Sequence, residues 1–160
     1  MPIYSITMTR RLSFHEFSCP DGQSLFFIRS TYSSVRHDRV WDFGCMPAPN
    51  EAVSKTCQWT DYGNEFDMRL DFVSPDGWVI AGVSSYNSDT FEDRRYKFRV
   101  CQLQGFHVAD CIKTDWVNDY AAYMEFMVPD GKILTGWYSI HNNIYEDRHH
   151  KMVMCNLVQN

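Results

Sequence analysis

Residues 75–94 read PDGWVIAGVSSYNSDTFEDR, and segments 20–39 and 129–148 have the same frame. Each segment begins with Pro-Asp-Gly, continues with an apolar stretch and ends with Asp-Arg. Successive copies begin 55 and 54 residues apart. A fixed period of this size indicates one supersecondary unit that is used repeatedly. We therefore divide the 160 residues into unit one (about 1–49), unit two (about 50–104) and unit three (about 105–160) of a single domain.

Alternating apolar and polar residues predict strands within the units. In unit two the alternation covers residues 66–72 and 95–100, and in unit three it covers 120–126. The apolar runs 78–83 and 133–138 predict core strands, and the Pro-Asp-Gly triplets predict tight turns. With a further strand around 58–62 and no sustained helical period, about twelve strands are expected. The sequence thus predicts an all-β domain of three units about a pseudo-threefold axis, either β-prism-like or β-trefoil-like.

Composition and motifs exclude several classes of function. The net charge of −5 disfavours nucleic acid and anionic membrane surfaces as partners. No apolar run is long enough for a membrane span, so membrane insertion is not expected. The sequence has no nucleophile elbow, zinc-protease helix or phosphate-binding loop, so we expect neither an enzyme nor a cofactor. Three similar units present three similar surfaces, which favours a multivalent binding protein.

The six cysteines belong to the repeat. Sequence alone does not choose among their connectivities, but equivalent positions should pair equivalently. The expected disulfides lie within units and join Cys19 to Cys45, Cys57 to Cys101, and Cys111 to Cys155. On the loop-entropy model each would contribute about 3.5–4 kcal/mol, less any native strain. Disulfides indicate a secreted, extracellular protein; the alternative is six buried free thiols in a cytosolic one.

These features resemble those of the dermatopontin family. In unit one the matching stretches are Cys19–Gln23, Arg29–Ser30, Asp38–Phe43 and Cys45–Pro49. The family's Asp-Arg-x-aromatic motif recurs with Trp41 and Tyr96, whereas His150 replaces the aromatic residue in unit three. The resemblance covers about residues 14–157. Because the chain lacks the further cysteines of some members, it is most similar to the shorter invertebrate forms.

The resemblance implies a secreted, non-catalytic extracellular protein. One reading is a lectin or agglutinin that cross-links glycans of the cell surface or matrix, with glycosaminoglycans among the candidates. The alternative is a structural matrix or adhesion protein that binds proteoglycans or proteins and no sugar. A homo-oligomer would extend the multivalency of either.

The Asp-Arg pairs allow two interpretations. Arginine can bind carboxylates, sulfates or sugar hydroxyls, but a pair beside an inward aromatic residue is more typical of a buried structural clasp. We therefore predict structural clasps at Asp38, Arg39, Asp93, Arg94, Asp147 and Arg148.

The polar tips that precede the Asp-Arg motifs are the predicted binding surface. They cover residues 32–37, 86–92 and 141–146. Large aromatic side chains in loops are more often functional than those in the core. Unit three is the preferred site, because paired amides and a tyrosine suit sugar hydroxyls. The candidate ligand-binding residues are Asn142, Asn143, Tyr145, His141, Tyr86, Asn87, Asp89, Tyr32 and Arg36. No metal site is expected, since strand alternation places His149 and His150 on opposite faces.

Overall fold

The computed structural model describes residues 14–160, so the first thirteen residues of unit one lie outside the described part. These residues form eleven strands and one short 3-10 helix, which confirms the all-β prediction. The elements are β1 (Phe14–Ser18), β2 (Gln23–Ser33), β3 (Asp38–Pro47), η1 (Pro49–Glu51), β4 (Val53–Trp59), β5 (Leu70–Val73), β6 (Trp78–Ser88), β7 (Asp93–Leu103), β8 (Phe106–Lys113), β9 (Met124–Met127), β10 (Lys132–Asn142) and β11 (Asp147–Gln159).

Three sheets surround one core, and each sheet is built on the long hairpin of one unit. The strand orders are β3-β2-β9, β1-β6-β7-β4 and β5-β10-β11-β8. A short strand from a different unit completes each sheet: β9 pairs with β2, β1 with β6, and β5 with β10. Glycine allows two of these close approaches, because a Cβ on Gly82 or Gly136 would lie 2.6 or 2.8 Å from a backbone oxygen of the added strand. The three units are therefore interlocked by strand exchange.

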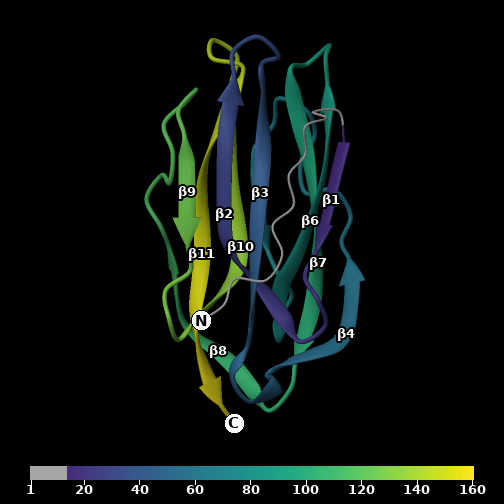
Figure 1. Cartoon of the computed structure of the whole chain (residues 1–160), viewed down its shortest axis with the longest axis vertical. Helices are drawn as coiled ribbons and strands as arrows, with labels where there is room; N and C mark the ends of the chain where they lie inside the picture. The colour runs from purple at the N-terminus through teal and green to yellow at the C-terminus, as the bar shows by residue number, and fades with distance from the viewer. Residues whose placement is uncertain (1–13) are drawn as a thin grey trace.

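The hairpin tips gather at one end of the molecule. In Figure 1 the turns of β2–β3, β6–β7 and β10–β11 all lie at the top, and the C-terminus lies at the bottom. The Pro-Asp-Gly turns precede β2, β6 and β10, so they lie at the opposite ends of the same hairpins. In each turn the proline carbonyl accepts a hydrogen bond from the N–H three residues later. The predicted tips of the three units thus form one surface.

Two predicted strands are only half present. The alternation over 66–72 predicts one strand, yet β5 begins at Leu70. Asp67 instead has a φ of 63°, and its N–H donates to Asp93 Oδ2 at 2.8 Å. Unit three shows the same correction, since β9 begins at Met124 and the N–H of Ala121 donates to Asp147 Oδ2. Tertiary hydrogen bonds to the Asp-Arg motifs therefore hold these segments as loops.

Covalent and aromatic contacts fill the interior. The three disulfides join the pairs expected from the repeat, Cys19–Cys45, Cys57–Cys101 and Cys111–Cys155. At the centre, the rings of Trp41, Tyr96 and His150 contact one another with centroids 5.4–6.3 Å apart. These are equivalent positions of the three units, so the core centre lies where the units meet. Within the described residues, no helix has the length and hydropathy required to cross a membrane.

His150 occupies this centre as a neutral base. Its Nδ1 accepts a hydrogen bond of 2.9 Å from the indole N–H of Trp137, and its side chain is fully buried. Burial, reinforced by Arg39 and Arg148, lowers the pKa of His150 well below its ordinary value. Burial likewise lowers the pKa of His15 to about 3. Protonation of either ring opposes the folded state.

We predict that His150→Phe makes stability less sensitive to acid. In the unfolded chain His150 binds a proton below a pKa of about 6.5, whereas in the fold it stays neutral. Its contribution is complete above that pH and is lost as pH falls, by up to about 1.4 kcal/mol per pH unit. Urea unfolding at pH 7 and pH 5 should show a loss for the wild type that is about 2 kcal/mol larger than that of the variant. Equal losses would contradict a neutral buried His150.

Candidate functional site

A closed ring of six charged side chains lies beneath the hairpin tips. Each arginine binds the aspartate of another unit through two hydrogen bonds, from Nε and Nη2 to the two carboxylate oxygens. The pairs are Arg39 with Asp147, Arg94 with Asp38, and Arg148 with Asp93, at 2.7–3.0 Å. Because unit one binds unit three, unit three binds unit two, and unit two binds unit one, the contacts run in a cycle.

The ring is buried and hydrogen-bonded to its own frame. All six side chains lie in residues that are at most 6% exposed. Nη1 of each arginine reaches a buried serine of its own hairpin at 3.1–3.5 Å, namely Ser30, Ser85 and Ser139. Nη2 of Arg39 also donates to Ala122 O, and Nη2 of Arg148 to Met68 O. Little of these arginines is available to an external ligand, and the clasp assignment stays a prediction that the substitution below tests.

The predicted tip residues have different roles in the structure. Asn142 Oδ1 accepts hydrogen bonds from the N–H groups of Ile144 and Tyr145, so this amide holds the turn. Tyr145 is half exposed, and Asn143 is exposed. Tyr32 donates through its hydroxyl to Tyr145 O at 2.7 Å, which joins the tips of units one and three. Arg36 and Asp89 are exposed, whereas Asn87 is half-buried.

A row of five aromatic rings, four of them stacked and the last tilted, runs from the unit-three tip across the outer face of its sheet. We call these rings the unit-three aromatic row; in order they are Tyr145, Tyr120, His149, Trp116 and Tyr138. The closest rings are His149 and Trp116, with centroids 3.4 Å apart and planes 10° apart. Lys151 Nζ lies 4.5 Å from the Trp116 centroid, and Lys113 Nζ 4.5 Å from that of Tyr138. The row combines ring surface with nearby hydrogen-bond donors.

A related row covers unit two. Phe91 stacks on Phe66 with centroids 5.0 Å apart, and Phe66 and Tyr62 both contact Tyr86 edge-on. Arg95 lies 4.6 Å from the Tyr62 ring and donates to the Tyr86 hydroxyl at 3.0 Å. Of the nine predicted ligand residues, Tyr86 and Tyr145 therefore belong to these rows.

Sequence reasoning missed Trp116 and Tyr120 because they lie in the loop before β9 rather than at a tip. Their repeat equivalents, Tyr62 and Phe66, are also aromatic. Aromatic residues at both positions of both units were the signal that could have identified the rows. The loop before β9 contacts the unit-three tip, where the Tyr120 ring stacks on the Tyr145 ring with centroids 5.4 Å apart.

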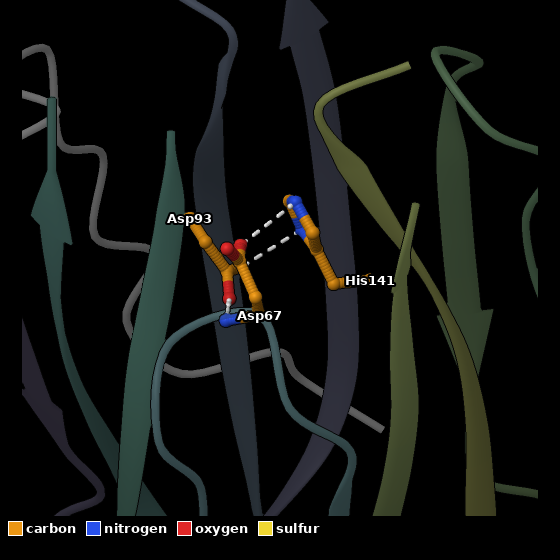
Figure 2. Close-up of side chains that lie close together, drawn as sticks. All are labelled: Asp67, Asp93 and His141. Carbon is orange, nitrogen blue, oxygen red and sulfur yellow. Dashed lines mark hydrogen bonds and ion pairs between the residues drawn. The ribbon is translucent and has the colours of Figure 1, made fainter. Parts of the chain in front are cut away.

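His141 differs from its prediction as a surface residue. Its side chain is 1% exposed and points toward the carboxylates of Asp67 and Asp93, as Figure 2 shows. Nδ1 lies 3.2 Å from Asp93 Oδ1, and Nε2 lies 3.2 Å from Asp67 Oδ1 and 3.5 Å from Glu146 Oε2. Burial would lower the pKa of His141, but the Asp93 carboxylate outweighs it and raises that pKa. His141 therefore belongs to an acidic cluster at the boundary between units two and three.

Comparison with known proteins places these features in context. The sequence model of the Dermatopontin family matches residues 12–159. The chain is 36% identical to Millepora cytotoxin-1 of Millepora dichotoma over 87% of its own length, but it spans only 61% of that protein. It is 34% identical to dermatopontin of Biomphalaria glabrata, covering 88% of this chain and 93% of that one. It is also 34% identical to the hemagglutinin/amebocyte aggregation factor of Limulus polyphemus, over 88% and 81% of the two chains. No solved structure matches the chain.

We predict that Arg94→Ala lowers the free energy of unfolding by about 3–5 kcal/mol, because it leaves the buried Asp38 carboxylate without its main counter-charge. Arg29→Ala is the matched control, since Arg29 also binds a carboxylate, that of Asp42 at 2.7 Å, but its side chain is 37% exposed. The control should lose at most about 1 kcal/mol. Replacing both Arg94 and Asp38 by Leu should recover much of the loss. A normally stable Arg94→Ala protein that fails to bind glycans would make Arg94 a binding residue instead.

Proposed function

Because the chain belongs to the dermatopontin family, we propose that it is a secreted carbohydrate-binding protein, a lectin or agglutinin that cross-links glycans of the cell surface or matrix. A relative that is named a hemagglutinin and aggregation factor supports this proposal. Three disulfides suit an extracellular protein. The proposed activity is binding alone, without catalysis.

The unit-three aromatic row is the observation that carries the proposal. Sugars stack their C–H faces on aromatic rings, while their hydroxyls need polar partners nearby. Trp116 is 38% exposed and Tyr145 is 50% exposed, so ring surface is available to a ligand. The ammonium groups of Lys113 and Lys151 lie over the rings of Tyr138 and Trp116, and the exposed Asn143 lies in the tip. The row therefore offers both kinds of contact that a saccharide uses.

The unit-two row supports the cross-linking part of the proposal. Phe91 occupies the repeat position of Tyr145 and is 46% exposed. Two weak sites on one chain gain avidity only when both can engage the same surface. The two rows differ in chemistry, because Phe91 has no hydroxyl where Tyr145 has one. We expect unequal sites, with unit three the stronger.

A second candidate function is a matrix or adhesion protein that binds proteoglycans or proteins rather than free sugar. The specific observation in its favour is the apolar character of two tips. Val35 is 89% exposed and Ile144 is 87% exposed. They belong to the β2–β3 and β10–β11 turns, which lie at the same end of the molecule (Figure 1). Neither side chain can bond a sugar hydroxyl, whereas both can contribute to a protein interface.

We predict that Trp116→Ala and Tyr145→Ala each weaken glycan binding roughly 2- to 10-fold, since aromatic contacts are worth about 0.5–1.5 kcal/mol beyond area burial. A glycan array identifies the sugar, and red-cell agglutination with competing sugars measures the effect. Phe91→Ala is the control in unit two and should have the smaller effect. Asn142 is left intact because it holds the turn.

The two candidate functions give different results in this experiment. If no variant of the unit-three aromatic row alters glycan binding, the binding site lies elsewhere on the protein. If the protein binds no glycan and causes no agglutination that sugars inhibit, the matrix or adhesion function is the one supported. Melting temperatures of the variants should stay near that of the wild type, because both rings are partly exposed.

A further inference from the structure

We propose that His141 Nε2, Asp67 Oδ1 and Glu146 Oε2 bind a divalent transition-metal ion such as Zn²⁺ at the boundary between units two and three. The three ligands come from two units: Asp67 lies in the loop before β5, whereas His141 and Glu146 flank the unit-three tip. Figure 2 shows the imidazole facing the two aspartates. Bound metal would thus join the same two units that Arg148 and Asp93 join.

The imidazole is buried without a well-directed hydrogen bond. Its side chain is 1% exposed, and neither ring nitrogen has a hydrogen-bond partner, although three carboxylates lie within ion-pair range. Buried polar atoms in proteins are normally paired, so a buried imidazole that faces three carboxylates without a well-directed hydrogen bond needs an explanation. A metal ion on Nε2 satisfies that nitrogen and leaves the proton on Nδ1.

The distances from the imidazole nitrogen to the two carboxylates fit tetrahedral coordination. Zinc binds histidine nitrogen and carboxylate oxygen at about 2.0–2.2 Å, so neighbouring ligand atoms of a tetrahedron lie about 3.4 Å apart. Nε2 of His141 lies 3.2 Å from Asp67 Oδ1 and 3.5 Å from Glu146 Oε2. Asp67 and Glu146 are 35% and 22% exposed, so solvent can reach the site and supply the fourth ligand.

Asp93 acts as the outer carboxylate of this site. Metal-binding histidines commonly present their second ring nitrogen to a carboxylate, which fixes the ring orientation. Asp93 Oδ1 lies 3.2 Å from Nδ1 of His141, and both Asp93 oxygens accept hydrogen bonds from Arg148. Arg148 therefore balances the charge of Asp93. When His141 binds a metal ion its imidazole is neutral. The charges that remain beside it are those of Asp67 and Glu146, and a divalent cation balances both.

The equivalent boundary between units one and three has none of these ligands. There the repeat places Tyr32 at the position of His141, Ala121 at that of Asp67, and His37 at that of Glu146. Tyr32 uses its hydroxyl to bind the backbone oxygen of Tyr145. The Arg-Asp pair is present at both boundaries. The cluster at His141 is therefore an addition to the shared frame, not something the frame requires.

The donor set selects the class of metal. One imidazole nitrogen with two carboxylate oxygens suits zinc and neighbouring transition ions. Calcium and magnesium prefer oxygen ligands only, and magnesium demands octahedral geometry. We therefore expect Zn²⁺, and Co²⁺ as its spectroscopic substitute, to bind in preference to Ca²⁺.

Metal binding by the full chain tests the proposal. Calorimetric titration of chelator-treated protein should give one Zn²⁺ per chain, and Co²⁺ should give the visible absorption of a tetrahedral site. Asp67→Asn and Glu146→Gln keep the side-chain shape and should each lower Zn²⁺ affinity by at least the roughly 10- to 100-fold that follows loss of an outer-shell partner. Both residues are partly exposed, so these variants should fold with unchanged melting temperature in the absence of metal.

His107→Gln is the matched control, because this exposed imidazole pairs with Asn160 far from the cluster. The control should bind Zn²⁺ as the wild type does. Absence of stoichiometric binding would overturn the proposal. So would wild-type affinity in Asp67→Asn and Glu146→Gln, or nitrogen chemical shifts showing that both ring nitrogens of His141 keep their protons when Zn²⁺ is added.

Discussion

The cyclic set of Arg-Asp pairs is the constraint on which the rest of this structure depends. Removing six charged groups from water costs several kcal/mol per ion, and that cost is offset only when each guanidinium meets its carboxylate with good geometry. Here every carboxylate belongs to a different unit from its arginine. No single unit can satisfy its own charges, so the pairing favours all three units adopting their positions together. Strand exchange between the sheets has the same consequence.

The ring also determines what lies above and below it. Below it, Trp41, Tyr96 and His150 follow their arginines by two residues and therefore point to the same side, where their rings meet. Above it, the residue before each aspartate has a φ near 52°, which turns the chain back into the hairpin tip. Because the ring fixes the frame on both sides, tip residues can differ among the units without loss of core packing.

The sequence predicts those parts of the structure that depend on local pattern and period. Alternation and the apolar runs were enough for the all-β class. Equivalence of the units was enough for the disulfide pairs and the gathering of the tips. Neither was enough for residues 66–69, where alternation predicts a strand but a hydrogen bond from Asp67 to Asp93 imposes a turn. Nor does a period show which unit supplies the partner of each arginine. The His141 cluster depends on that placement, so sequence reasoning did not find it. The aromatic rows lie within single units, and they were missed because Trp116 and Tyr120 lie in the loop before β9 and not at a tip.

Three equivalent Arg-Asp pairs carry hairpin tips of different composition, because some positions of the repeat tolerate substitution and others do not. The Asp and Arg of the ring occur in all three units, because replacing either residue of a pair would leave a buried charge of another unit without its partner. Six residues before each aspartate, however, the chain has Tyr32, Asn87 and His141. Each of these positions lies opposite the ring arginine of its own hairpin without being part of the ring, so each can take a different partner. Tyr32 joins two tips, whereas His141 collects carboxylates from two units. The three units therefore share the buried Arg-Asp pairs. They differ at the residues directly outside those pairs.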